Sequence, residues 1–354
     1  MVWPFKRRPK SVLGIDIGTS VIRVIELTRR GDQEELKNYG FVSISPYYER
    51  PVRRIRKDTL LLSAREISEI LKLILRTAKI KTQKAVFSLP DFSSFFTSFS
   101  LPPMSKEEIP QAVQFEARRH VPLPLSEVTL DWSITKGTVS SQKKEELEIL
   151  LVAVPNSTID QYKKIFELCK LELISLEAEV FGLQRSLIRD NKETIALIDI
   201  GAQSTTCSIV DKKILKYSHS FDVAGNDLTE RLSKSLNLDY KVAEDLKKKR
   251  GILEDEQKTR DILTPLFDLM LVDIGKVTES FYQEEGKEIQ TYIIAGGSAF
   301  LPGLKEYFSE HLKKAVKIAN PFARMFYPSI LEDVLKEIGP EFSVAVGMAL
   351  KGLE

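Results

Sequence analysis

Cysteine and histidine are both scarce in this chain. The two cysteines, Cys169 and Cys207, stand in apolar stretches without the spacing of a metal site, so we expect buried, reduced thiols and no disulfide framework. The three histidines, His120, His219 and His311, are isolated from one another in the sequence. This distribution argues against a zinc site.

Long hydrophobic runs and a dominant charge are also missing. No stretch approaches the roughly 18 apolar residues that span a bilayer, and the basic start MVWPFKRRPK lacks the apolar segment of a secretory signal. Trp3 and Phe5 beside these basic residues leave two interpretations open, a frayed terminus or contact with an anionic membrane surface. The formal net charge of +2 gives no indication of a nucleic-acid binder.

Length and composition are those of a folded protein with more than one domain. The 354 residues exceed what one ordinary core accommodates. Hydrophobic residues make up 43% and charged residues 29% of the chain, which is typical of soluble globular proteins.

One strand-and-turn pattern occurs twice in the chain. The segment LGIDIGTS at residues 13–20 returns as LIDIGAQSTT at residues 197–206, about half a chain later. In each copy an apolar strand ends in Asp-x-Gly and the chain turns back at once. The repeat predicts two halves of like fold that present their turns to a shared cleft.

The residue types in these turns suit a phosphate group. Gly18 and Gly201 allow backbone N–H groups to approach phosphate oxygens closely, and the hydroxyls of Thr19 and Ser20 can donate further hydrogen bonds. An aspartate at the strand end can hold the water shell of a Mg²⁺ ion, which keeps most of its waters. Two such turns would hold one triphosphate from both sides.

A third glycine turn follows in IIAGGSAFLPGL. The trio Gly296-Gly297-Ser298 stands between an expected strand and a helix that we expect to begin near Leu301. An edge that binds adenosine needs such close backbone approach. An ordinary strand-to-helix turn is the alternative.

The rest of the pattern divides the chain into segments. Residues 11–44 predict three strands, and the apolar period in residues 63–79 predicts an amphipathic helix. Between residues 84 and 174 the order strand–strand–helix occurs twice, and Ser105 with Glu108 forms a capping box before the first helix. This order predicts a compact α+β module inserted into the main chain.

Taken in this order, the glycine turns resemble those of the actin-like ATPase superfamily. GIDIGTSVIRV is similar to its first phosphate loop, LIDIGAQSTTCSIV to its second, and IIAGGSAFLPGL to its adenosine motif. ISLEAEVFGLQRSL and PEFSVAVGMAL are similar to the two small-residue helices that cross at the hinge between the halves. The resemblance implies an α/β fold with two lobes, the duplicated ribonuclease H-like fold of actin.

The place of the inserted module narrows the resemblance to the FtsA branch, with its SHS2-type 1C subdomain. Within that branch, the basic lead into the first strand and the stretch QFEARRHVPLPLSEVTLDWSI resemble the PilM family of type IV pilus assembly proteins. The resemblance implies the following subdomains: 11–83, first part of 1A with phosphate loop 1; 84–174, inserted 1C; 175–192, hinge helix of 1A; 193–225, 2A with phosphate loop 2; 226–289, mostly helical 2B; 290–336, return of 2A with the adenosine motif; 337–354, C-terminal helix of 1A.

The resemblance implies a cytoplasmic, ATP-binding scaffold of pilus biogenesis and twitching motility. Such a protein is peripheral to the inner membrane, because it docks the N-terminal cytoplasmic tail of the membrane protein PilN where the inserted module meets the first domain. Pilus motor ATPases, other proteins of the alignment complex and further copies of the chain are the other partners that it implies. ATP and Mg²⁺ are the implied cofactors.

The resemblance also implies a set of site residues. Asp16 and Asp199 would hold Mg²⁺ through water. The nucleotide-binding positions are Asp16, Gly18, Thr19, Ser20, Arg23, Asp199, Gly201, Ala202, Gln203, Ser204, Thr205, Gly225, Asn226, Gly296, Gly297 and Ser298. Two positions depart from the family pattern, because Arg23 stands where a lysine is frequent and Ala224 precedes Gly225 where many relatives have two glycines.

ATP hydrolysis requires a polar group that orients the attacking water. Glu179 on the hinge helix and Gln203 in the second turn are the candidates, although a helix surface or loop role is open for each. Glu177, two residues before Glu179, is expected on another face of the same helix. The sequence therefore predicts nucleotide binding and leaves efficient turnover open.

Two other functions have different requirements. An FtsA-like cell-division protein that forms membrane-tethered filaments would be expected to continue into a membrane-binding helix, and none follows before Glu354. A small-substrate kinase of the same superfamily would need a substrate pocket with a catalytic carboxylate, and the sequence shows no such constellation.

Overall fold

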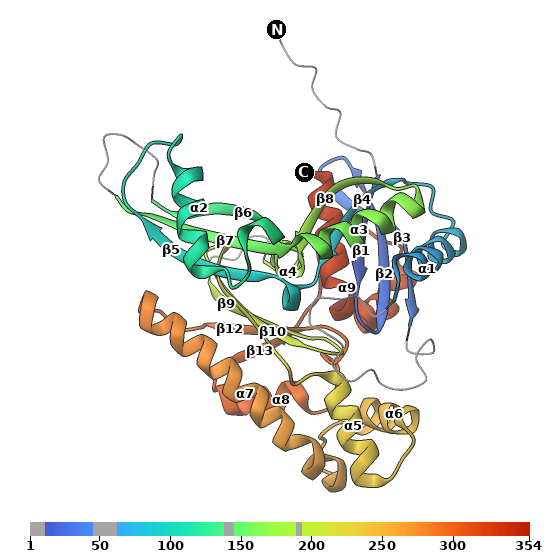
Figure 1. Cartoon of the computed structure of the whole chain (residues 1–354). Coiled ribbons are helices and arrows are strands. Elements are labelled where there is room, and N and C mark those ends of the chain that lie inside the picture. Colours follow the sequence, from blue (N-terminus) through green and yellow to red (C-terminus); the bar gives the residue numbers. More distant parts are fainter. Residues whose placement is uncertain (1–10, 45–61, 138–144, 189–192) are drawn as a thin grey trace.

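Two five-stranded sheets of identical strand order form the frame of the molecule (Figure 1). The computed structural model describes residues 11–44, 62–137, 145–188 and 193–354, so the expectation for Trp3 and Phe5 lies outside the described residues. The first sheet has the order β3-β2-β1-β4-β8, from β1 (Ser11–Ile17), β2 (Val21–Arg30), β3 (Gln33–Ser43), β4 (Lys84–Leu89) and β8 (Glu172–Ala178). The second has the order β11-β10-β9-β12-β13, from β9 (Thr194–Ile200), β10 (Thr205–Asp211), β11 (Ile214–Phe221), β12 (Thr291–Ala295) and β13 (Ala315–Ile318).

The pairing pattern is also the same in both sheets. In each, the first three strands along the chain form an antiparallel meander, and the next two pair in parallel beyond the first strand. Strands β1 and β9 are therefore central, and their near-continuous apolar sequences are buried on both faces as such positions require. The predicted duplication is confirmed.

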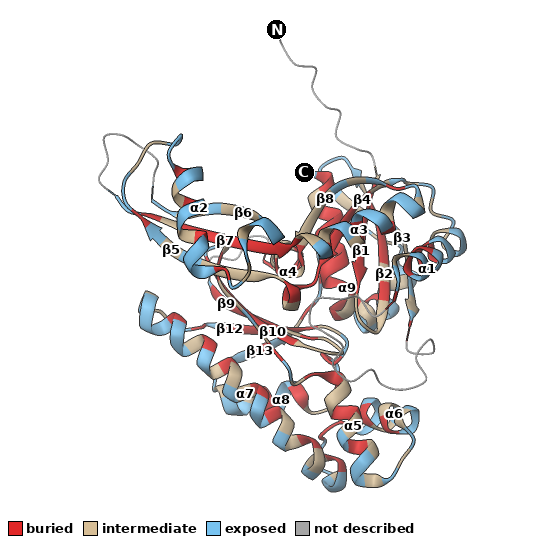
Figure 2. Ribbon diagram, in the orientation of Figure 1, coloured by how far each residue is buried: buried red, intermediate tan, exposed pale blue. Residues whose placement is uncertain are grey.

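Helices cover these sheets and complete two lobes, which Figure 2 shows with buried centres. Lobe 1 is the first sheet with its helices α1 (Ala64–Thr77), α3 (Asn156–Cys169), α4 (Glu179–Leu187) and α9 (Glu332–Leu353). Lobe 2 is the second sheet with α5 (Gly225–Leu236), α6 (Tyr240–Arg250), α7 (Gln257–Glu285) and α8 (Leu304–Leu312). The helix expected over residues 63–79 is confirmed, with Ser63 and Glu66 in a reciprocal capping box.

The inserted module is smaller than the repeated strand–strand–helix pattern suggested. It consists of a three-stranded sheet, β5-β7-β6, and helix α2, with the bounds β5 (Phe95–Leu101), α2 (Ile109–His120), β6 (Val128–Lys136) and β7 (Leu147–Pro155). Strand β4 and helix α3 belong instead to lobe 1, since β4 pairs with β1 and β8 and α3 packs on α1. The nearly continuous burial of β4 explains its place inside a parallel sheet.

The N-terminal boundary of α2 also differs from its sequence pattern. The side chain of Glu108 accepts a hydrogen bond from the Ser105 N–H at 2.8 Å, which is one half of a capping box. The helix itself begins at Ile109, with Pro110 in its first turn, where a missing N–H is tolerated.

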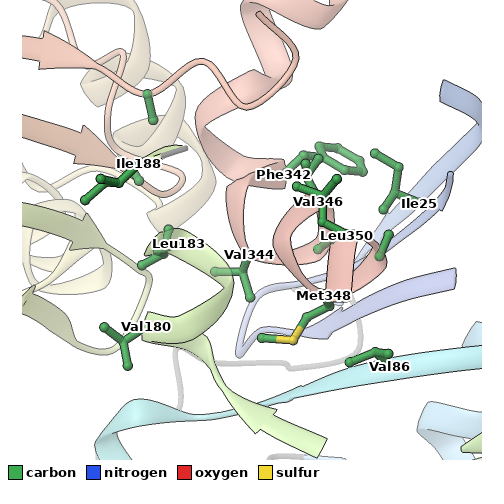
Figure 3. Packing of buried hydrophobic residues seen from close by; sticks show 14 of the residues in the cluster. Ile25, Val86, Val180, Leu183, Ile188, Phe342, Val344, Val346, Met348 and Leu350 are labelled. Carbon is green, nitrogen blue, oxygen red and sulfur yellow. The ribbon is translucent and has the colours of Figure 1, made fainter. Parts of the chain in front are cut away.

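Helices α4 and α9 cross at the junction of the lobes through glycine. A Cβ atom at Gly347 would lie 1.9 Å from the carbonyl oxygen of Gly182, so only glycine permits this approach. Figure 3 shows the surrounding core, with Leu183 and Val180 on α4 near Val344 and Met348 on α9. The predicted helix crossing is confirmed, although residues 175–178 of the expected hinge helix, 175–192, belong to strand β8.

Candidate functional site

The two Asp-x-Gly turns have the same local structure. The first joins β1 to β2 and the second joins β9 to β10. The N–H of Gly18 donates to the carbonyl oxygen of Val21 at 3.1 Å, and the N–H of Gly201 donates to that of Ser204 at 3.0 Å. The sequence repeat thus corresponds to two equivalent hairpin turns.

Arg23 links the first turn to the C-terminal helix. Asp16 and Arg23 are cross-strand partners, which places their side chains on the same face. The guanidinium contacts Asp16 Oδ2 at 3.3 Å through Nη1 and Glu341 Oε2 at 2.9 Å through Nη2. The Ser88 hydroxyl donates to the other oxygen of Asp16 at 2.8 Å. The buried Nε of Arg23 has no hydrogen-bond partner among the described residues.

The third glycine turn brings lobe 2 to the same region. Gly296 has φ +86°, and a Cβ atom there would lie 2.4 Å from Asp199 Oδ1. Its N–H donates to the carbonyl oxygen of Pro340 on α9 at 3.1 Å, and a Cβ atom on Gly297 would lie 3.9 Å from the Glu341 carboxyl. The turns that carry Asp16 and Asp199 therefore border one region between the lobes.

The N-terminus of α5 lies on the second turn. The N–H of Gly225 donates to the carbonyl oxygen of Gly201 at 3.0 Å, and the N–H of Asn226 donates to that of Ala202 at 2.9 Å. A Cβ atom on Gly225 would lie 3.0 Å from Ser298 Oγ. The predicted site residues of lobe 2 are thus neighbours. Helix α8 begins at Leu304 and not near Leu301, where we expected it.

The hydroxyl residues of the turns differ in their accessibility. Thr205 is fully buried, and its hydroxyl donates to the carbonyl oxygen of Val223 at 2.7 Å, so this side chain supports the turn. Four predicted side chains at the turns are partly exposed: Thr19, Ser20, Gln203 and Ser204.

Glu179 lies at the start of α4 and is paired with Asp91. The Asp91 N–H donates to Glu179 Oε2 at 3.1 Å, and the Val180 N–H donates to Asp91 Oδ1 at 3.2 Å. Glu177 is in strand β8, away from this pair, and contacts Arg185 at 2.8 Å. The expectation that Glu177 lies on the same helix is therefore wrong, and Glu179 is the one of the two that faces the carboxylates.

Burial dominates the electrostatics of these acids. It raises the pKa of Asp91 to about 8 and that of Asp199 to about 6. Burial also raises the pKa of Glu179 well above its usual range. It raises the pKa of Asp16 as well, although Arg23 and Ser88 favour the charged form of that carboxyl. These four acids are close enough to repel one another when charged, so a bound cation would stabilise their charged forms.

One observation fits the binding of a nucleotide phosphate at these residues. The orphaned Nε of Arg23 is a buried donor that a phosphate oxygen can satisfy. Within residues 11–44, 62–137, 145–188 and 193–354, no group of three or more His, Cys, Asp or Glu side chains has the geometry of a direct metal site.

A buried lysine of lobe 2 supports the N-terminus of α5. Lys247 Nζ donates to the carbonyl oxygen of Gly225 at 2.9 Å and to the Thr229 hydroxyl at 2.8 Å, and it pairs with Glu244 at 2.7 Å. Burial lowers the pKa of Lys247, and Glu244 opposes this shift. The network fixes α6 against the end of α5 that contacts the second turn.

Sequence reasoning missed four residues around this site: Ser88, Asp91, Lys247 and Glu341. Ser88 lies within the buried strand β4 and Asp91 comes two residues after its end, so recognition of that strand as a neighbour of β1 would have identified them. Lys247 stands in the stretch KVAEDLKKKR, where the sequence does not distinguish a buried lysine from its exposed neighbours. Glu341 carries no local signal at all.

Comparison with known proteins identifies the family. A sequence model described as type IV pilus assembly protein PilM matches residues 14–353. The chain belongs to this family. Cell division protein FtsA of Staphylococcus epidermidis is 25% identical over 193 residues, which are 48% of this chain and 42% of the relative. FtsA of Helicobacter pylori is 24% identical over 234 residues, 58% of this chain and 47% of the relative. The PilM-family chain is thus aligned with less than half the length of these curated relatives.

Solved structures confirm the actin-like fold of this PilM-family chain. A PilM-PilN type IV pilus biogenesis complex has a TM-score of 0.85 at 23% identity and covers 98% of this chain and 99% of that one. MreB 5 of Spiroplasma citri bound to AMPPNP has a TM-score of 0.56 at 14% identity, with coverages of 96% and 95%. None of the helices in the described part of the chain is long and apolar enough to cross a membrane.

Proposed function

We propose that this PilM-family chain is a nucleotide-binding scaffold of type IV pilus assembly that docks the N-terminal cytoplasmic tail of PilN. The observation that carries the nucleotide site is the meeting of two equivalent Asp-x-Gly turns at one region between the lobes, joined by Arg23, Glu341 and the glycine pair at 296–297. The MreB 5 structure with AMPPNP shows that this fold can hold a nucleotide in another protein.

The proposed binding mode assigns each part of the site a task. Asp16 and Asp199 would hold Mg²⁺ through its water shell, and a bound ion would supply positive charge to the phosphate groups. Backbone N–H groups of the two turns bind phosphate oxygens, and Arg23 presents its free Nε to them. Residues 296–298 and the N-terminus of α5 border the adenosine.

For ATP hydrolysis, Glu179 and Gln203 are the two candidates for orienting the attacking water. Glu179 has the better position of the two candidates, since it lies with Asp91 near Asp16 and Asp199. Burial raises its pKa well above the usual range and so favours the protonated form, and a protonated carboxyl is a poor acceptor for the proton of an attacking water. We therefore propose slow turnover, with Gln203 as the second candidate for orienting water.

Docking of the PilN tail is supported by the family and by the PilM-PilN complex of similar fold. A peptide that becomes ordered in a preformed groove joins a membrane protein to a scaffold that itself need not touch lipid. The scaffold would then lie at the cytoplasmic face of the inner membrane, where motor ATPases, alignment-complex proteins and further copies of the chain are its other proposed partners.

Thermal unfolding with and without Mg²⁺–ATP tests the nucleotide site. At a ligand concentration of 100 times Kd, binding stabilises a protein by about 2.7 kcal/mol, and we expect Asp16→Ala and Asp199→Ala to lose most of that gain. Asp131→Ala, on the exposed side of β6, is the matched control and should keep it. Equal stabilisation of all three variants and the parent would contradict the nucleotide site.

Binding of a synthetic PilN tail tests the scaffold. A fluorescently labelled peptide with the sequence of the cytoplasmic tail should bind the purified chain saturably, and a scrambled peptide of the same composition should not. Absence of specific binding both with and without ATP would contradict the scaffold role while leaving the nucleotide site intact.

A further inference from the structure

A buried lysine on β11 joins the inserted module to lobe 2. Lys216 is 8% exposed, and its Nζ lies 2.8 Å from a carboxylate oxygen of Glu148 on β7 and 2.8 Å from one of Glu285 at the end of α7. Hydrogen bonds to both carboxylates hold the lysine charged, so that its pKa is raised in spite of burial. One ammonium thus pairs with acids from two structural units.

A β-bulge places Lys216 in this position. The pairing of β10 with β11 shifts register between Ile209 and Val210, which pair with Tyr217 and Leu215, so Lys216 is the extra residue. A bulge redirects the side chain of the extra residue and increases the local twist. Strand β11 also contacts β5 and the 3-10 helix η2 (Asp91–Ser93), so the side of the module lies along this strand.

Lobe 1 contains the equivalent bulge, which makes a useful internal comparison. The pairing of β2 with β3 shifts register between Glu26 and Leu27, and the extra residue is Lys37. Lys37 is about half exposed and pairs with Glu26 of its own lobe at 3.1 Å. The duplicated fold therefore has a lysine at both bulges, and only the one in lobe 2 reaches another structural unit.

The hairpin that carries Lys216 connects directly to the nucleotide site. Strand β10 begins at Thr205, next to the second turn, and ends at Asp211, where the chain turns into β11. The two residues of this far turn, Lys212 and Lys213, have φ of 50° and 69°, a left-handed conformation that is unfavourable for lysine. Gln184 of α4 donates to the Lys213 carbonyl oxygen at 2.6 Å and holds the turn at the hinge.

We propose that the β10–β11 hairpin couples the nucleotide site to the inserted module, with Lys216–Glu148 as the link. The hairpin carries the second phosphate-binding turn at one end and the contacts to Glu148 and Gln184 near the other, and strand pairing makes it rigid between them. A displacement of the second turn on nucleotide binding moves Lys216 relative to the module. This inference rests on the proposed nucleotide binding and assigns the inserted module a response to it.

Hydrogen–deuterium exchange of the full chain tests the link. Glu148→Gln weakens only the contact between module and lobe 2 and keeps the Lys216–Glu285 pair, which avoids an unpaired buried lysine. Glu288→Gln is the matched control, because Glu288 pairs with Lys314 inside lobe 2 on the surface. Lys216→Met is the second variant, to be compared with Lys276→Met on exposed α7.

We expect Mg²⁺–ATP to slow exchange at both turns in every variant, with affinities within about threefold of one another. In the parent and the two controls it should also slow exchange in β5 and β7, and in Glu148→Gln and Lys216→Met that second response should fall by about half or more.

Two results overturn the inference in different ways. The coupling alone is contradicted if the turns of the parent are protected but β5 and β7 show no response. It is also contradicted if both Glu148→Gln and Lys216→Met keep the full response in β5 and β7. Absence of protection at the turns of the parent contradicts the proposed nucleotide binding, and the coupling with it.

Discussion

Buried acids dominate the site at the scale of single residues. Asp16, Asp91, Glu179 and Asp199 approach one another where the lobes meet, and Arg23 is the cation that contacts one of them. Charged carboxylates in such a place oppose folding, because burial removes their hydration and like charges repel. The metal-bound nucleotide that we propose would relieve both effects, so the residues expected to favour its binding are the ones that destabilise the empty protein.

Asp91 provides a test of this cost that leaves the proposed ligand contacts untouched. Its pKa of about 8 in the folded state is above the usual value of 3.8, so protonation favours folding, and the contribution is lost as pH rises through about 8. Between pH 6 and pH 8 this single group should remove about 2 kcal/mol of stability from the parent.

We expect Asp91→Asn to flatten that part of the pH profile. The amide keeps an oxygen that accepts from the Val180 N–H, and it carries no charge at any pH. Urea unfolding without nucleotide should show the variant close to the parent at pH 6 and more stable at pH 8.5. Parallel profiles over this range would show that Asp91 does not titrate there.

At the scale of elements, the crossing of α4 and α9 fixes how the lobes meet. Gly182 and Gly347 allow the helices to touch through backbone, and the core around them includes residues of both sheets, such as Val12 of β1 and Ile195 of β9. Because the Gly347 position lies against the Gly182 carbonyl, this point of the crossing has no room for a side chain on α9.

Gly347→Ala tests the crossing. The added methyl group has no room beside Gly182, and we expect a loss of about 2–3 kcal/mol in the free energy of unfolding. Gly275→Ala on α7 is the matched control, because a Cβ atom there meets nothing within 4 Å, and alanine should stabilise the helix by about 0.5–1 kcal/mol. Equal effects of the two changes in urea unfolding would refute the close approach.

At the scale of the whole molecule, the duplicated lobes and the inserted module combine two tasks. The lobes bring equivalent turns together, and the module adds a surface that the duplication alone does not provide. Membership of the PilM family and an actin-like fold are shown, and the scaffold proposed on this basis reaches the membrane through its partner.

Sedimentation with lipid vesicles distinguishes this scaffold from an FtsA-like filament. We expect the chain with Mg²⁺–ATP to remain in the supernatant with plain anionic vesicles, and to pellet when the vesicles carry an anchored PilN tail peptide. Vesicles that carry a scrambled peptide are the control. ATP-dependent pelleting as membrane-bound filaments on plain vesicles would favour the FtsA-like function.

The sequence by itself determined the features that depend on neighbours along the chain. The two Asp-x-Gly turns, the helix after Ser63 and the small-residue helices follow from local rules, because backbone freedom, capping and apolar period are set within a few residues. The order of these motifs predicted the two-lobed fold, since each copy of the Asp-x-Gly pattern belongs to one lobe.

Only the tertiary structure decided which distant segments meet. The sequence of strand β4 is compatible with pairing either inside the module or beside β1. In the structure β4 pairs in parallel with β1, so it belongs to lobe 1 and places Ser88 and Asp91 at the site. Glu341 and Lys216 are of residue types that usually lie on the surface. Glu341 pairs with Arg23 and Lys216 pairs with Glu148, and each partner is more than 60 residues away in the sequence. Long-range pairing depends on how whole elements pack, and that information is not contained in any short stretch of sequence.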